Sequence, residues 1–204
     1  MARSSHYLCE FGTLKRFYVI LFEDNKSNKL GSTNQFWQFS LQVYERKDFA
    51  HSCISLQDNY GIDVNILLYC CWAASEGHSV LSKEEIDSLC RSVKNWNHEV
   101  VQKLRSIRRY LKNHDINHLE AFSQNIRCKV LEIEIKAEQV EQDLLTNTVS
   151  ISKNKYMSDQ CRVRNALENI RTYFAILGVP KAASTSELRI ILKGVFPNII
   201  EKDI

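Results

Sequence analysis

The sequence predicts an all-α fold: a compact, single-domain bundle of six to eight helices around a hydrophobic central helix. The chain has only six glycines and two prolines in 204 residues, whereas strands and hairpins need such turn residues at short intervals. Apolar residues recur at helical spacing from Asn34 onward, and capping residues and glycines separate the segments. The 44% apolar and 25% charged fractions are ordinary for a globular protein. Neither disorder nor a disulfide scaffold is therefore expected.

Three helices are predicted in the first half of the helical domain. They are residues 35–46 after Thr33 or Asn34 as N-cap, residues 49–60 between Asp48 as N-cap and Gly61, and residues 64–76 between Asp63 as N-cap and Gly77. The third is apolar nearly all round from Ile66 to Trp72, so we expect it to be the central buried helix.

The second half predicts longer helices with the same kind of boundaries. In chain order they are residues 82–94 with the capping box Ser82/Glu85, an interruption near Asn95–Asn97, a continuation to Leu111, residues 118–145, an exposed loop over 146–156, residues 158–177 ending at Gly178, and residues 184–196 with the capping box Ser184/Glu187. Residues 1–33 are expected to be an appendage and linker, residues 34–197 the helical domain, and residues 198–204 a tail.

Cysteine usage and hydropathy predict a cytoplasmic protein. The seven cysteines include no CxxC pair and no zinc-type spacing, so we interpret them as reduced thiols and expect no metal. The apolar run from Phe17 to Phe22 is too short for a signal peptide, and no run approaches the roughly 18 apolar residues of a membrane span. We therefore expect no membrane association.

The middle of the chain resembles a proteobacterial family of uncharacterised proteins, filed as a domain of unknown function. The matching segments are FWQFSLQVY (36–44), CISLQDNYGIDVNILLYCCW (53–72) and LRSIRRYLK (104–112). Residues 118–178 match more loosely, and residues 1–34 do not match. The resemblance implies a compact, cytoplasmic helical protein and carries over no reaction, cofactor or catalytic residue.

The densest polar cluster surrounds the turn at Gly61. Its candidate ligand-binding residues are Gln57, Asp58, Asp63 and Asn65, joined by Tyr69 and Trp72 on the following helix. One interpretation is structural: Asp63 caps a helix, and Gln57 and Asp58 hydrogen-bond across the corner. The alternative is a small-molecule pocket, because Asn65, Tyr69 and Trp72 share one helical face. The structural interpretation is favoured, since buried polar groups usually hydrogen-bond to one another and help to specify a single fold.

A basic stripe is the second candidate. Arg105, Arg108, Arg109 and Lys112 share one helical face, and Glu134, Glu138 and Glu141 share a face of the next helix. An antiparallel pair of these helices would form an intramolecular ion-pair seam. We choose Arg108 and Glu138 as the test pair because each lies in the middle of its helix. If the two helices are shifted by one turn, Arg105 or Glu134 takes part in the pair instead. The alternative is a nucleic-acid face, which the mild net charge of +3 does not favour.

Known catalytic patterns are missing from the sequence. It contains no E-x-x-H for a di-iron bundle and no GxGxxG, GxxxxGK[ST], GxSxG or HExxH. A cysteine–histidine pair formed in space stays open but carries little signal. We therefore assign no catalytic residue and no cofactor. The leading hypothesis is a non-enzymatic interaction or scaffold protein with a protein partner, and the alternative is a small-molecule-binding bundle that could be an enzyme.

Overall fold

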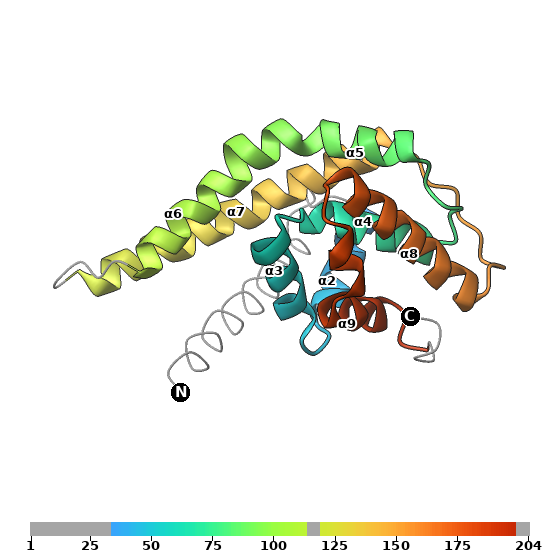
Figure 1. Cartoon of the computed structure of the whole chain (residues 1–204). Helices are drawn as coiled ribbons and strands as arrows, with labels where there is room; N and C mark the ends of the chain where they lie inside the picture. The colour runs from blue at the N-terminus through green and yellow to red at the C-terminus, as the bar shows by residue number, and fades with distance from the viewer. Residues whose placement is uncertain (1–33, 114–118, 199–204) are drawn as a thin grey trace. The chain divides into compact units, whose positions relative to one another are not determined.

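The computed structural model describes residues 34–113 and 119–198, and every regular element in these ranges is helical (Figure 1). The all-α prediction is confirmed. In chain order the elements are α2 (Gln35–Tyr44), α3 (Phe49–Tyr60), α4 (Val64–Ser75), α5 (Lys83–Trp96), the π-helix η1 (Asn97–Val101), α6 (Gln102–Asn113), α7 (Glu120–Thr148), α8 (Asp159–Ile176), the 3-10 helix η2 (Pro180–Ser184) and α9 (Ser186–Val195). The predicted appendage (1–33) and nearly all of the predicted tail lie outside the described residues.

The chain divides into two compact units, which we describe separately. The first unit comprises residues up to Asp87 together with those from Ser150 onward. It therefore holds α2, α3, α4, the start of α5, α8, η2 and α9. The second unit, Ser88–Val149, holds the rest of α5, η1, α6 and α7.

Helix α4 is the core of the first unit, as its apolar sequence predicts. Every residue from Asn65 to Ala74 is buried. α8 packs along it, and α3 packs against α9. A helix without a polar face must be covered by its neighbours, and α2, α3 and α9 also contact α4.

Most of the helix boundaries follow from local side-chain chemistry. Asn34 caps α2, with its Oδ1 accepting from the Phe36 amide at 2.9 Å. Ser82 and Glu85 form the predicted reciprocal box: the Ser82 amide donates to Glu85 Oε2 at 2.7 Å, and the Glu85 amide donates to Ser82 Oγ at 3.1 Å. Gly61 ends α3 at a φ of 67°, a left-handed conformation that glycine adopts without strain.

Two predicted caps are wrong in detail. Asp48 precedes α3 at a φ of 59°, and its side chain makes no capping hydrogen bond; its carbonyl accepts from Ser52 instead. The last helix is capped by Thr185, not Ser184, with the Leu188 amide donating to Thr185 Oγ1 at 3.3 Å. Pro180 opens a 3-10 helix that includes Ser184, which shifts the start of α9 by one residue.

The second unit consists of the rest of α5 and of α6, which are joined by η1, together with the long helix α7. The predicted interruption near Asn95–Asn97 corresponds to η1, where the Gln102 amide donates to the Asn97 carbonyl five residues back. α7 runs three residues into the predicted loop and ends at Thr148. Figure 1 shows α6 and α7 side by side.

Candidate functional site

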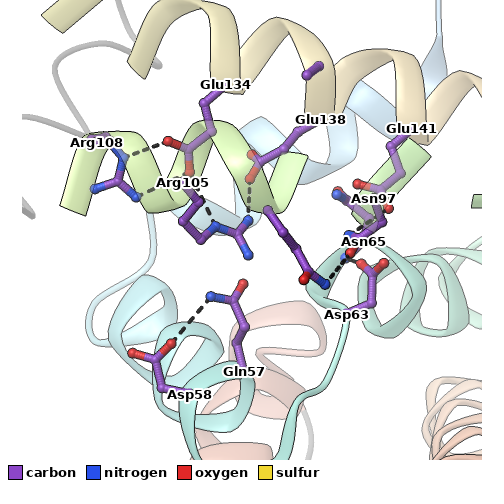
Figure 2. Close-up of polar contacts among 12 residues, drawn as sticks. Gln57, Asp58, Asp63, Asn65, Asn97, Arg105, Arg108, Glu134, Glu138 and Glu141 are labelled. Carbon is purple, nitrogen blue, oxygen red and sulfur yellow. Dashed lines mark hydrogen bonds and ion pairs between the residues drawn. The ribbon is translucent and has the colours of Figure 1, made fainter. Parts of the chain in front are cut away.

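The corner at Gly61 is held by a cap and by a tyrosine hydroxyl. Asp63 caps α4, with its Oδ1 accepting from the Asn65 amide at 2.9 Å. The Tyr173 hydroxyl accepts from the Asp63 amide at 2.9 Å and donates to the Asp63 carbonyl at 3.3 Å. Gln57 Nε2 lies 3.4 Å from Asp58 Oδ1 at the end of α3 (Figure 2). The Asp63 cap is the one that the structural interpretation predicted, whereas the Gln57–Asp58 contact joins two neighbours within α3 and does not cross the corner.

The aromatic side chains of the predicted pocket pack against one another. Tyr69 is fully buried and Trp72 is 6% exposed. The Phe36 ring contacts both, edge-on to Tyr69 at 5.3 Å and stacked on Trp72 at 5.2 Å between centroids. The indole N–H of Trp72 is buried without an acceptor among the described residues. The rings thus fill the space between α2 and α4, the arrangement of a core cluster.

Two buried amides of α8, which the sequence analysis did not single out, complete the polar network of the first unit. Asn169 accepts from the Leu81 amide at 2.8 Å and donates to the Cys70 carbonyl at 3.3 Å. Asn165 donates to the His78 carbonyl at 3.0 Å. Their i, i+4 spacing on an otherwise apolar helix face was the available signal. Both amides satisfy backbone groups that folding removes from water.

The buried thiols are poor nucleophiles. Burial raises the pKa of Cys71 to about 12. Burial also raises the pKa of Cys53, and nearby Cys71 adds to the effect. A thiol must ionise to attack a substrate or bind a metal, so both groups stay protonated and unreactive near neutral pH.

The basic stripe pairs with the acidic face of α7 inside the second unit. Arg108 Nε lies 2.6 Å from Glu134 Oε2, and Arg105 Nη2 lies 2.8 Å from Glu138 Oε1 (Figure 2). Arg105 Nε also reaches Glu134 Oε1 at 3.2 Å. Later positions on α6 pair with earlier positions on α7, so the helices run antiparallel. Arg108 meets Glu134, one turn from the representative partner Glu138.

The ion-pair seam, which we define as Arg105, Arg108, Glu134 and Glu138, is largely buried. The side chain of Glu134 is 4% exposed, and those of Arg105 and Arg108 are 17% and 12% exposed. Burial opposes the charge on Arg105, but Glu138 and Glu134 outweigh it and hold its pKa above the ordinary value. Both arginines are thus committed to protein carboxylates.

The other charged residues of the two faces divide between the surface and η1. Arg109 is exposed on α6, and Lys112 is partly exposed near its end. Glu141 is fully buried and accepts from Asn97 Nδ2 at 3.0 Å. The neighbouring Trp96 indole donates to the Ala137 carbonyl at 2.8 Å. The π-helix therefore begins where two side chains attach this segment to α7.

A different side of α7 carries large apolar side chains in solvent, a feature that the sequence analysis missed. Among the described residues, seven of the ten exposed large hydrophobic side chains lie in the second unit. We define the α7 stripe as Phe122, Ile126, Ile133 and Val140, which are 71%, 52%, 54% and 42% exposed. At 100° per residue these positions lie roughly 120° around α7 from Glu134 and Glu138. Their spacing in the sequence was the signal that could have revealed them.

A small hollow lies in the first unit, away from the predicted pocket residues. Ser75, Arg162, Phe196 and Asn198 are among its lining residues, and its volume is about 140 Å³. Ligand pockets usually measure about 300–1,000 Å³. In the described ranges, no three His, Cys, Asp or Glu side chains gather as a metal site requires, and no helix is long and apolar enough to cross a membrane.

Comparison with known proteins identifies one family. A family model described as "Protein of unknown function (DUF2390)" matches residues 35–145. The match runs from the start of α2 through most of α7, so it includes the Gly61 corner, the ion-pair seam and the α7 stripe. Neither a curated protein nor a solved structure matches the chain.

Proposed function

The chain belongs to the DUF2390 family, and we propose that it is a non-enzymatic, cytoplasmic interaction module that binds a protein partner through the α7 stripe. The observation that carries this proposal is the exposure of four large apolar side chains along one line of one helix. Apolar side chains that line up in solvent on one face of a helix often mark interaction sites, and Lys129 and Lys136 lie among those of this line. The assignment to the cytoplasm is supported by the seven cysteines, interpreted as thiols.

The ion-pair seam supports the proposal because it makes the stripe a rigid surface. Glu134 and Glu138 tie α7 to α6 through hydrogen bonds of 2.6–3.2 Å. Ile133 directly precedes Glu134 in sequence, so its backbone is held before any partner arrives. A preordered surface loses less conformational entropy on binding, which strengthens association.

The contacts of the other candidate residues favour a protein-binding role over a catalytic or ligand-binding role. Tyr69 and Trp72 pack with Phe36, and Arg105 and Arg108 face carboxylates of their own unit. A phosphate-binding role would require these arginines to exchange Glu134 for a ligand, although ion pairs this deeply buried are costly to break.

Affinity purification from the native host tests the proposal, with mass spectrometry of both proteins and small molecules. The variant Ile126→Glu/Ile133→Glu places two charges on the stripe. Its matched control is Ile107→Glu on α6, because Ile107 is 49% exposed and lies off α7. Far-UV circular dichroism checks that all variants fold.

We expect one or more proteins to be retained by the wild type and by Ile107→Glu, and to be lost from the double variant. The same protein set with all three baits would contradict the proposal. A small molecule that accompanies every bait stoichiometrically would favour a ligand-binding role instead.

A further inference from the structure

Two lysines accompany the α7 stripe at regular spacing. Lys129 and Lys136 are exposed, and each lies three residues after an isoleucine of the stripe, Ile126 or Ile133. At 100° per residue, both lysines lie on the same flank of the stripe, roughly 45° around α7 from its mean direction. Apolar and lysine side chains therefore alternate at intervals of three and four residues, which is the spacing along which one helix packs on another.

The two lysines carry charges that the described parts of the chain leave unpaired. Neither Lys129 nor Lys136 forms an ion pair with a residue in 34–113 or 119–198. Arg105 and Arg108, in contrast, are held by carboxylates of α7. A lysine in a helix seam packs its apolar stem against its neighbours and directs its ammonium group to the rim. The stripe thus offers apolar contact and two cationic positions together.

These charges decide which kind of helix fits the stripe. A wholly apolar helix would remove the ammonium groups of Lys129 and Lys136 from water without giving them a partner, which is unfavourable. A helix that carries Asp or Glu opposite the two lysines pairs them, and charged residues at such positions set partner choice between helices. A basic helix is repelled. Charge complementarity therefore selects an acidic helix.

The stripe is a poorer match for a lipid surface. Helices that lie on membranes present a broad apolar face with basic residues on the polar side. The four side chains of the α7 stripe fall within roughly 40° of arc, which is narrow. Glu132 is also exposed, roughly 50° beyond the lysines. It would face anionic headgroups, whereas a protein helix needs carboxylates only opposite the lysines.

Resting on the proposed function, we propose that the partner segment bound by the α7 stripe is an amphipathic helix with apolar residues at seven-residue spacing and acidic residues opposite Lys129 and Lys136. From Phe122 to Val140 the stripe extends over roughly 27 Å, so the partner helix needs about five turns. One helix face of this length lies at the small end of specific interfaces. The isolated segment is therefore expected to bind with a Kd on the order of micromolar.

Site-specific cross-linking in the native host identifies the segment. The full chain carries p-benzoylphenylalanine in place of Asn125, which is exposed on the lysine flank of α7. Irradiation followed by mass spectrometry of the cross-linked peptides shows what lies against this flank. We expect a segment of about 20 residues with apolar residues at helical spacing and with more acidic than basic residues. A neutral or basic segment, or a segment of this chain itself, would overturn the inference.

The cross-linked segment is then made as a peptide, and fluorescence anisotropy measures its binding to the full chain. Lys129→Glu/Lys136→Glu should raise the Kd at least about 30-fold, because it sets like charges together at two positions. Lys129→Arg/Lys136→Arg keeps both charges and should change the Kd less than about 3-fold. The matched control is Lys94→Glu/Lys155→Glu, which makes the same change in net charge at exposed positions of α5 and of the loop before α8.

We expect this control to change the Kd less than about 3-fold. Equal weakening by the control, or no weakening by Lys129→Glu/Lys136→Glu, would overturn the role of the two lysines. A peptide with Lys in place of its acidic residues should bind Lys129→Glu/Lys136→Glu better than it binds the wild type, and the reverse order would also overturn that role. Circular dichroism confirms that every variant is folded.

Other outcomes separate this inference from the proposed function. If a protein depends on Ile126 and Ile133 in the native-host purification but the segment it presents is not acidic, the proposed function stands and the inference fails. If no protein depends on these isoleucines, the proposed function fails and the inference fails with it. Sedimentation with phosphatidylcholine vesicles that contain about 30% phosphatidylserine, abolished by Lys129→Glu/Lys136→Glu, would identify a membrane surface as the occupant and overturn the inference.

Discussion

Removing the carboxylate of Glu134 should loosen the second unit more than its place in a charged run suggests. Glu134 accepts from Arg108 Nε at 2.6 Å, from Arg108 Nη2 at 3.1 Å and from Arg105 Nε at 3.2 Å. Its side chain is only 4% exposed. The variant Glu134→Gln keeps the shape of the side chain but leaves two arginines with one carboxylate fewer.

The expected loss of stability on Glu134→Gln lies between two limits. Removing one partner of a fully buried ion pair costs about 3–5 kcal/mol, whereas exposed pairs contribute about 0–1 kcal/mol. Arg105 retains Glu138 at 2.8 Å, and both arginines keep some solvent, with 12–17% of their side chains exposed. We therefore expect Glu134→Gln to cost about 2 kcal/mol, which is roughly a 30-fold change in an opening equilibrium.

Hydrogen exchange of α7 peptides measures this loss locally, because exchange reports the opening of each cooperative unit. The matched control is Glu168→Gln on α8. Glu168 meets Arg171 at 2.8 Å, but its side chain is 48% exposed. We expect this control to change protection in α8 less than about 2.5-fold. A Glu134→Gln effect as small as that of the control would refute the assignment of the seam as a buried structural element.

Three further predictions concern the first unit and are measured by urea denaturation. Gly77→Ala should lower the free energy of unfolding by more than about 3 kcal/mol, because the added Cβ would clash with the Asn154 carbonyl. Gly61→Ala should cost about 1 kcal/mol, because the Cβ meets open space and only the left-handed φ is strained. Equal losses in the two variants would contradict this explanation. Trp72→Ala should cost about 3–5 kcal/mol, and a loss under about 1 kcal/mol would place Trp72 on the surface. Burial raises the pKa of Cys71 from 9 to about 12, so the unfolded state releases the thiol proton first and stability falls as pH rises from 9 toward 12. Cys71→Ala should lose less stability than the wild type as the pH rises in this range. An unchanged pH dependence would contradict the assignment of this loss to the Cys71 thiol.

The elements that the sequence predicted well depend on short-range chemistry. Asp63 caps α4 and Ser82 pairs with Glu85 because each contact spans only two or three residues. Where a neighbouring element intervened, the prediction failed: the 3-10 turn that starts at Pro180 moved the cap of α9 from Ser184 to Thr185. Local spacing therefore places helices accurately but fixes their ends only when nothing else competes for them.

The ion-pair seam shows how far spacing alone extends to tertiary contacts. The stripe on α6 and the acidic face on α7 each follow from a period of 3.6 residues. Which arginine meets which glutamate depends on where the two helices begin to run side by side. The π-helix at Asn97–Val101 adds a residue to one turn just before α6 and so changes the phase of every later side chain. The spacing alone leaves this axial register open, and in the structure Arg108 meets Glu134.

The α7 stripe was missed because the usual rule assigns apolar residues to the core and charged residues to the surface. At two neighbouring positions of α7 the assignment is reversed, since Glu134 is 3% exposed and Ile133 is 54% exposed, whereas Leu131 and Ile135 are buried as the rule expects. The buried carboxylates are tolerable only because Arg105 and Arg108 neutralise them. An isolated helix pair would bury more apolar surface if α7 turned its isoleucines toward α6. Placing Glu134 inside and Ile133 outside therefore withholds apolar surface from folding, and the proposed function gives that surface a role in binding a partner.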